Sequence, residues 1–234
     1  MPSPNALRVL HWNIHSWRAP GGDTNTAAAA DLITRTAPDV VTLAEADEVW
    51  GSPSGVREVA ARCGYSWVFV PAFEFGGDQP AGGFGNALLT TLPIRALQQW
   101  QLLWPPRLYD GTEPSEPRSA TVALLSSPAG LVWAGVTHMP RADTQARDAA
   151  LSRLQDLTGA LDEPWLICGD FNTPPSSWAA PAVVSSAHLT YPADEPSEAI
   201  DYCVASPGFD LDAEVIPAAG SDHLPVLIRA RPAR

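Results

Sequence analysis

A set of polar residues in this sequence lies at or near the ends of apolar segments that have the length of β-strands. They are Asn13, Glu45, His138, Asp170, Asn172, Asp201, Asp222 and His223. Side chains at strand ends on one rim of a sheet can converge on one point, and binding sites often lie there. Asp201 is the least ordinary of them because it lies inside the apolar run AIDYCVA, where a carboxylate is expensive to bury without a partner.

The types of these side chains fit the hydrolysis of a phosphoester. Carboxylates and amides are hard oxygen ligands that suit Mg²⁺ or Mn²⁺ better than zinc, and histidines can donate to phosphate oxygens or exchange protons. Taken singly, each residue has a plainer interpretation: Asn13 and Asp170 as turn residues, and Glu45 as an ion-pair partner of Arg57. Only the whole set indicates chemistry, because phosphate transfer needs charge neutralisation, a base and hydrogen-bond donors together.

The charge balance limits the partners. The formal net charge is −12, and all 14 basic residues are arginine. Such a chain is a poor general binder of polyanions, unless acidic residues gather where a divalent cation restores positive charge; many of the carboxylates simply favour solubility. Binding of nucleic acid would depend on a small set of loop residues near the strand ends. They are Arg18, Arg107, Arg118 and Arg141 for phosphates, with Trp17 and Trp104 for base stacking.

The length and patterning predict one α/β domain spanning residues 1–234. Helices are expected at 25–37, 54–64 and 146–162, and strands at 7–12, 40–45, 66–70, 86–91, 95–103, 119–127, 131–138, 165–168, 198–206 and 223–230. Polar or glycine-rich loops are expected at 71–85 and 105–117. Because few strands are joined by helices, the pattern favours two mainly antiparallel sheets flanked by helices over a regular doubly wound sheet.

The same sequence carries expectations about cellular location. No signal peptide is visible, no apolar run approaches the roughly 20 residues that cross a bilayer, and the three cysteines have no metal-site spacing. These features predict a cytoplasmic protein with reduced thiols, no membrane span and no obligate protein partner.

Seven segments, in order, resemble motifs of the endonuclease/exonuclease/phosphatase superfamily. They are LHWNIHSW, VVTLAEADE, GNALLTTLPI, VTHM, LICGDFNTPPSS, AIDYCVAS and GSDHLPV, and they cover nearly the whole chain. The group includes DNase I-like nucleases, abasic-site endonucleases, sphingomyelinases, inositol polyphosphate phosphatases and deadenylases. The resemblance implies a four-layer α/β sandwich, with two mainly antiparallel, mixed β-sheets faced by helices and the site at one rim.

The resemblance also implies which residues hold the metal and the water. Glu45 would be the principal ligand of Mg²⁺ or Mn²⁺, helped by Asn13 and by Asp222, directly or through water. Asp170 would orient or deprotonate the attacking water. Asn172 beside it would hold water, phosphate or a second ion.

A second group of residues would bind and position the phosphate. The resemblance implies that His138 and His223 contact it and stabilise its developing charge. Asp201 would accept a hydrogen bond from His223 and favour the charged imidazole. Asn86 would orient His138, and Arg118 is a candidate phosphate contact.

Departures from the superfamily pattern bear on the substrate. Ala44 stands where a glutamine usually precedes the metal-binding glutamate, and His15 stands where abasic-site endonucleases carry an aspartate. These enzymes also carry a tyrosine-containing segment in place of VTHM, so the resemblance favours the branch with two histidines. His11, His15 and His188 are interpreted as structural or surface residues.

The sequence therefore predicts a divalent-metal-dependent phosphodiester hydrolase, a nuclease that cleaves DNA or RNA by in-line attack of water. The alternatives are a phosphoesterase acting on a lipid headgroup, inositol phosphate or other small phosphoester, and a non-catalytic binding protein on the same fold.

Overall fold

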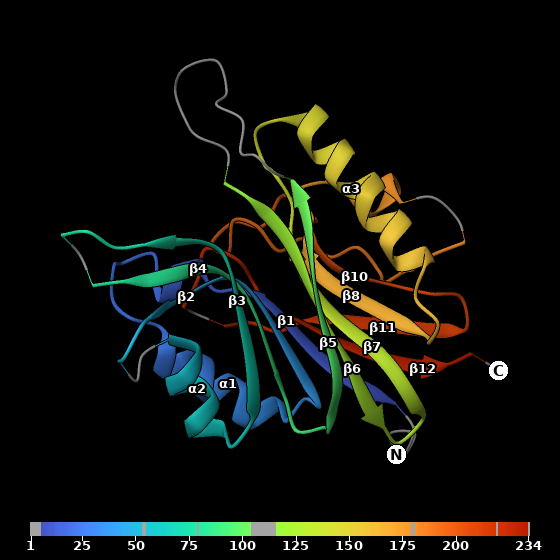
Figure 1. The fold of residues 1–234 in the computed structure, drawn as a ribbon, viewed down its shortest axis with the longest axis horizontal. Coiled ribbons are helices and arrows are strands. Elements are labelled where there is room, and N and C mark those ends of the chain that lie inside the picture. Colours follow the sequence, from blue (N-terminus) through green and yellow to red (C-terminus); the bar gives the residue numbers. More distant parts are fainter. Residues whose placement is uncertain are drawn as a thin grey trace.

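The computed structural model describes residues 6–52, 55–78, 80–103, 116–178, 181–218 and 220–233. Within these ranges the strands form two sheets of six strands each, packed face to face (Figure 1). In order across the first sheet lie β11 (Phe209–Val215), β12 (Val226–Pro232), β1 (Leu7–Asn13), β2 (Val40–Val49), β4 (Gly82–Thr90) and β3 (Ser66–Phe75). Across the second lie β5 (Ile94–Leu103), β6 (Arg118–Ser127), β7 (Gly130–His138), β8 (Trp165–Asp170), β10 (Asp201–Ala205) and β9 (Val183–Val184).

Both sheets are mixed and mainly antiparallel, as the sequence predicted. The β1–β2 and β7–β8 pairs are parallel, and the other described strand pairs are antiparallel. Helices α1 (Thr26–Thr36) and α2 (Gly55–Cys63) cover the outer face of the first sheet, and α3 (Thr144–Gly159) covers the second (Figure 1). Short 3-10 turns lie at His15–Trp17 and Pro175–Ser177. The predicted four-layer sandwich is confirmed.

Alternation along β1 explains how polar residues reach the layer between the sheets. Leu10 and Trp12 pack among residues of α1 and α2, whereas Val9 packs against the second sheet. Because successive side chains of a strand point to opposite faces, His11 and Asn13 share the inter-sheet face with Val9. The strand therefore buries two polar side chains between the sheets at its carboxyl end.

Glu45 reaches the rim because β2 is irregular there. The register of β2 against β4 shifts between Leu43 and Ala46, and Glu45 has a φ of 52°. Leu43 and Ala46 both pack on the helix side, so regular alternation after Leu43 would have placed Glu45 there as well. A bulge commonly re-aims one side chain in this way, and a left-handed glutamate costs about 1 kcal/mol or more.

Several element boundaries differ from the sequence prediction. Strands β3 and β4 continue into the segment 71–85, so the expected glycine-rich loop is mainly a long hairpin. Likewise β2 continues past Glu45 to Val49, the last strand begins at Val226, and β9 and β11 were not predicted. Most of the expected loop at 105–117, with Trp104 and Arg107, lies outside the described residues. Among the helices of the described chain, none is long and apolar enough to cross a membrane.

Candidate active site

The second sheet brings three of the predicted residues side by side. In the strand registers, His138 of β7 pairs with Asp170 of β8, and Asp170 pairs with Asp201 of β10. Gly169 allows β7 and β8 to approach closely, because a Cβ there would lie 2.6 Å from the backbone oxygen of Thr137. Side chains of residues that are paired across neighbouring strands point to the same face of a sheet, and these three point toward the first sheet.

Asn13 links this row to the first sheet. Its Nδ2 donates to Glu45 Oε1 at 3.0 Å and to Asp170 Oδ2 at 3.0 Å. Its Oδ1 accepts from the backbone N–H of His15 at 3.1 Å, which fixes the direction of the amide. In this arrangement Asn13 orients two carboxylates that come from different sheets.

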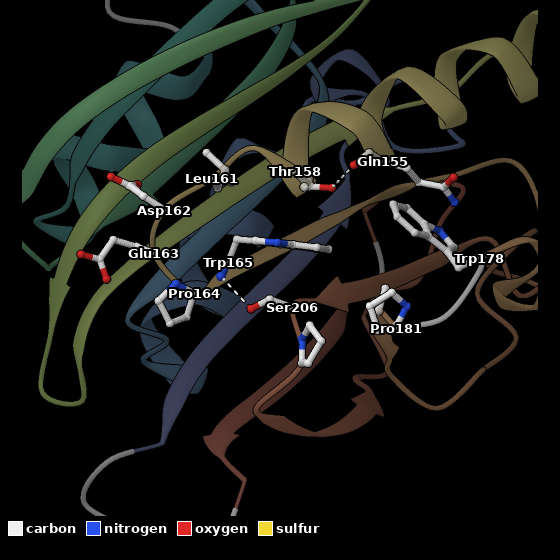
Figure 2. Close-up of a pocket in the computed structure, with 13 residues that line it drawn as sticks. Gln155, Thr158, Leu161, Asp162, Glu163, Pro164, Trp165, Trp178, Pro181 and Ser206 are labelled. Atoms are coloured by element: carbon white, nitrogen blue, oxygen red, sulfur yellow. Dashed lines mark hydrogen bonds between the residues drawn. The ribbon is translucent and has the colours of Figure 1, made fainter.

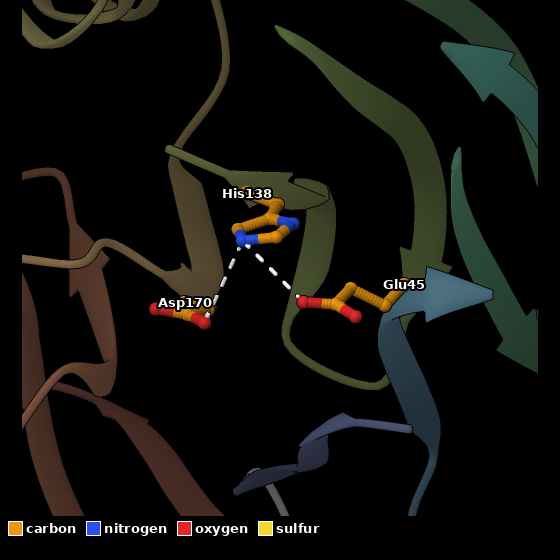
Figure 3. A group of neighbouring side chains, drawn as sticks. All are labelled: Glu45, His138 and Asp170. Carbon is orange, nitrogen blue, oxygen red and sulfur yellow. Dashed lines mark ion pairs between the residues drawn. The ribbon is translucent and has the colours of Figure 1, made fainter. Parts of the chain in front are cut away.

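Glu45, His138 and Asp170 form a compact cluster (Figure 3). His138 Nε2 lies 3.8 Å from Glu45 Oε1 and 3.6 Å from Asp170 Oδ2. One potential ligand atom from each residue lies within 4.8 Å of the others. Burial raises the pKa of Asp170 to about 7, and the charges of Asp201 and Glu45 add to that increase. The cluster therefore has more negative charge than its own surroundings neutralise.

That excess charge and the donor types fit a hard divalent cation. The carboxylates of Glu45 and Asp170 are the oxygen ligands that Mg²⁺ and Mn²⁺ prefer, and a bound cation would favour their ionised forms. Asn13 directs its amide hydrogens, rather than its oxygen, toward both carboxylates. In this metal-free arrangement Asn13 orients the two carboxylates, and its expected role as a metal ligand stays a prediction.

A second group of ionisable residues joins Asp201 to His223. His223 Nδ1 lies 2.8 Å from Asp201 Oδ2, and His223 Nε2 lies 3.7 Å from Asp170 Oδ2. Burial alone lowers the pKa of His223, but the charge of Asp201 and its hydrogen bond outweigh that effect and raise it to about 9. Burial likewise favours protonation of Asp201, but the charge of His223 and bonds from His11 and His223 hold the Asp201 pKa below its usual value. The pair is therefore an ion pair at neutral pH.

His138, in contrast to His223, is neutral. Burial lowers its pKa well below the usual value, and the positive charge of Arg118 lowers it further. Arg118 Nη1 lies 2.8 Å from His138 Nδ1. Because a guanidinium can only donate, we assign Nδ1 as the acceptor and place the single imidazole proton on Nε2, which faces Glu45 and Asp170. Asn172 Nδ2, 3.3 Å from the same nitrogen, then donates to the Met139 carbonyl alone.

Asn172 closes the side of the site next to His138. Its backbone N–H donates to Asp170 Oδ1 at 3.0 Å, and its Nδ2 donates to the Met139 carbonyl at 2.9 Å. The φ of Asn172 is 49°, a left-handed conformation that asparagine tolerates better than most residues. Its Oδ1 accepts from Arg141 Nη1 at 3.4 Å, so the amide orientation is fixed.

For three predicted residues the described contacts are with groups other than the expected ones. Asp222 Oδ1 is 3.4 Å from His15 Nδ1, with 34% of its side chain exposed, and it is in neither candidate metal-binding group of the described residues. Asn86 Nδ2 donates to the Ser119 carbonyl at 3.1 Å, while the described partner of His138 Nδ1 is Arg118. Trp17, expected to stack bases, is buried and donates from Nε1 to the Asp47 carbonyl at 2.8 Å.

The sequence interpretation missed residues that surround the Asp201–His223 pair. Thr190 Oγ1 donates to Asp201 Oδ2 at 2.6 Å, and His11 Nε2 lies 3.5 Å from Asp201 Oδ1. The Tyr191 ring packs on His223 with the ring centroids 4.6 Å apart. His11 had one available signal, its two-residue spacing from Asn13 on the same strand face. The loop containing Thr190 and Tyr191 had none.

Another pocket lies elsewhere, between α3 and the beginning of β8 (Figure 2). Its volume is about 490 Å³, and its lining includes Trp165, Trp178, Gln155, Asp162, Glu163 and Ser206. Trp165 is the first residue of β8 and Asp170 the last, so the pocket and the carboxylate cluster are about 17 Å apart along the strand. The described lining contains no histidine or arginine, and therefore lacks the groups that assist phosphate chemistry.

Solved structures resemble the fold across almost the whole chain. An endonuclease/exonuclease/phosphatase from Beutenbergia cavernae DSM 12333 matches with a TM-score of 0.75 at 21% identity, over 98% of this chain and 72% of that chain. A mannosyl-6-phosphatase from Bacteroides thetaiotaomicron VPI-5482 gives 0.73 at 16% identity, over 96% and 99%. The human Nocturnin catalytic domain with a bound sulfate anion gives 0.70 at 21% identity, over 98% and 94%. At these identities the likeness establishes the fold.

Sequence comparison establishes the family. Among curated proteins no match is found. A sequence model of the endonuclease/exonuclease/phosphatase family, however, matches residues 10–223, a span that contains every residue of both ionisable clusters. The match and the shared fold support a metal-dependent phosphoester hydrolase. The chain belongs to the endonuclease/exonuclease/phosphatase family.

Proposed function

We propose that this protein hydrolyses a small phosphoester with the help of Mg²⁺ or Mn²⁺. The observation that carries the proposal is the meeting of Glu45, His138 and Asp170 within 4.8 Å, next to the Asp201–His223 ion pair. A bound divalent cation would neutralise phosphate charge and polarise the phosphorus–oxygen bonds. Glu45 and Asp170 would hold it, with Asn13 orienting both carboxylates.

Asp170 is the proposed acceptor for the proton of the attacking water. A bound cation would keep Asp170 ionised, and an ionised carboxylate can orient the water and accept its proton. The backbone N–H of Asn172 and the amide of Asn13 each donate to one of its oxygens. These two bonds fix the plane of the carboxylate, so the water it binds would have a defined direction toward phosphorus.

The two histidines are the proposed donors to the phosphate oxygens. His223 is charged and would donate from Nε2, while Nδ1 remains bonded to Asp201. His138 is neutral and would also donate from Nε2, because Arg118 occupies its Nδ1. Two fixed donors on one rim would stabilise negative charge as it develops on the non-bridging oxygens.

The surroundings favour a small substrate over a long nucleic acid. Arg118 Nη1 lies 3.1 Å from Glu116 Oε2, and Arg141 Nη2 lies 3.1 Å from Glu198 Oε1. Affinity for a polynucleotide depends on several cations that meet phosphates, and these two already have carboxylate partners. With Trp17 buried, the predicted nucleic-acid surface loses its described aromatic component as well.

A hydrolysis panel tests the proposal. It contains a chromogenic phosphomonoester and phosphodiester, a sugar phosphate, an inositol phosphate, sphingomyelin, single-stranded DNA, RNA and supercoiled plasmid, each with Mg²⁺, Mn²⁺ or a chelator. We expect metal-dependent turnover that is fastest on a soluble small phosphoester. Asp170→Asn should abolish it. The matched control is Asp212→Asn, which changes an exposed carboxylate on β11 that pairs with Arg229 at 3.4 Å.

Each other outcome has a definite meaning. Faster cleavage of nucleic acid would reject the small substrate and restore the nuclease interpretation. Inactivity on every substrate with both metals would favour the non-catalytic binding protein. Activity that survives in Asp170→Asn would reject the proposed proton acceptor.

A further inference from the structure

We propose that His11 is a positioning residue that acts on His223 through Asp201. Its Nε2–H holds the second oxygen of the Asp201 carboxylate and thereby fixes the carboxylate that orients His223. The catalytic consequence rests on the proposed function, whereas the structural consequence is measurable without substrate or metal.

The first observation is a pair of buried polar atoms that face each other across the two sheets. His11 is fully buried, and Asp201 is 2% exposed. His11 Nε2 and Asp201 Oδ1 are 3.5 Å apart. Within the described part of the chain neither atom has another hydrogen-bond partner. Buried polar atoms are rarely left unpaired, so a small approach of these two atoms satisfies both.

The second observation is that the other Asp201 oxygen is already fully engaged. Oδ2 accepts from Thr190 Oγ1 at 2.6 Å and faces His223 Nδ1 at 2.8 Å. Both contacts involve the same oxygen, so in the described structure the carboxylate is held through Oδ2 alone. A donor on Oδ1 holds the second oxygen as well and keeps Oδ2 aligned with the imidazole.

Thr42 sets the ring of His11 for this role. Thr42 Oγ1 lies 3.1 Å from His11 Nδ1, closer than the 3.4 Å to the carbonyl of Leu10. A hydroxyl that donates to Nδ1 leaves the imidazole proton on Nε2, which faces Asp201. We assign this direction, so that Thr42 donates to His11 and His11 Nε2–H faces Asp201, whose other oxygen accepts from His223 Nδ1.

Packing alone does not require an imidazole at this position. Val9, the preceding residue on the same face of β1, packs in the apolar layer between the sheets. An apolar side chain would continue that layer at position 11 and avoid burying two nitrogen atoms. The contact with Asp201 is what accounts for a polar ring at position 11.

The test compares a substitution that keeps a hydrogen-bond donor with one that has none. His11→Gln places an amide donor near the position of Nε2, and His11→Phe keeps a ring without any donor. We expect His11→Phe to lower kcat about tenfold, as loss of an outer-shell partner commonly does, with KM little changed. His11→Gln should recover most of that loss. Thr42→Val should give a smaller loss, because the ring loses only its fixed tautomer.

A spectroscopic readout on the metal-free protein decides the inference independently of turnover. The Nδ1–H proton of His223 gives an NMR signal that reports its hydrogen bond to Asp201. We expect this signal to shift or broaden in His11→Phe and to stay close to the native position in His11→Gln. Should His11→Phe fail to fold in a thermal melt, His11→Met, which adapts to irregular spaces, replaces it.

Two results would overturn the proposal. One is an unchanged His223 signal in the folded variant that lacks a donor. The other is an equal fall of kcat in His11→Gln and His11→Phe, since a purely structural role does not distinguish a donor from a hydrocarbon ring. Absence of activity in the native protein would reject the proposed function, and the NMR comparison would still decide the role of His11.

Discussion

Replacement of Asp170 by asparagine should stabilise the metal-free protein at pH 8 while it removes activity. The pKa of Asp170 is raised from 3.8 to about 7, mainly by burial. A carboxyl with a raised pKa favours the folded state only while it is protonated. Its stabilising contribution is complete below pH 3.8 and is lost as the pH rises through about 7. At pH 8 the fold therefore contains a buried charge that opposes it.

The size of the effect follows from that difference in pKa. The pKa of Asp170 rises from 3.8 to about 7. At 1.36 kcal/mol per pKa unit, the ionised carboxylate lowers the free energy of unfolding of the metal-free protein by about 4 kcal/mol at pH 8. Asparagine has no such charge, but one of its oxygens becomes a donor, so the bond from Asn13 or Asn172 is lost at about 1–3 kcal/mol. The net gain is about 2 kcal/mol at pH 8. At pH 5 the charge costs only about 2 kcal/mol, and the gain falls to about zero.

Urea unfolding with a chelator at pH 5 and pH 8 measures this gain. A saturating amount of Mg²⁺ should raise the unfolding midpoint of the native protein, because a ligand that binds only the folded state stabilises it. The same addition should have much less effect on Asp170→Asn. Asp212→Asn, on the exposed face of β11, should behave like the native protein. An Asp170→Asn variant that is less stable than the native protein at pH 8 would refute the account of this buried charge.

Three further predictions concern the other ionisable groups. Glu45→Gln should shift the midpoint of a Mg²⁺ titration at least tenfold upward, and an unchanged midpoint in a kinetic or calorimetric titration would exclude Glu45 as a ligand. Asp201→Asn and His223→Gln should each lower kcat strongly, and the double variant little more than either, because the two residues act as one unit; additive losses in a double-mutant cycle would contradict this. For stability, the His223 pKa is raised from 6.5 to about 9, because the Asp201 charge outweighs burial. The pair therefore stabilises the fold fully below about pH 6.5 and loses that contribution as the pH rises through about 9. In urea unfolding, the difference in free energy of unfolding between the native protein and His223→Gln should therefore shrink across that pH interval. A difference that stays constant from pH 6 to pH 10 would count against the ion pair.

The sequence was sufficient to predict the residues that follow regular strand alternation. Asn13, His138 and Asp170 lie at the carboxyl ends of β1, β7 and β8, with side chains on faces that the period of two defines. Asp201 could be recognised by the cost of a carboxylate in an apolar run. The Asp201–His223 contact needed the family resemblance, because nothing local pairs residues 22 positions apart.

Other features depend on irregular backbone and could not be derived from local patterns. Glu45 reaches the rim through a bulge with a left-handed residue, whereas alternation alone directs it under α1 and α2. Asp222 was assigned by its motif, but its carboxylate faces His15, whose own φ is 50°. His11 was interpreted as structural because its partner, Asp201, belongs to the opposite sheet and to a segment 190 residues away.

The contacts of the site run mainly between the sheets rather than along them. Asn13 donates to Asp170 across the interface, and His223, which precedes β12 of the first sheet, pairs with Asp201 of the second. A site of this kind exists only while the two sheets keep their register and separation. The half-buried carboxylate of Glu45 and the buried carboxylates of Asp170 and Asp201 repel one another there, so the metal-free interface is less stable than its apolar core alone would make it. A bound cation would relieve that repulsion, and the same charge that weakens the empty interface would give the cation its affinity.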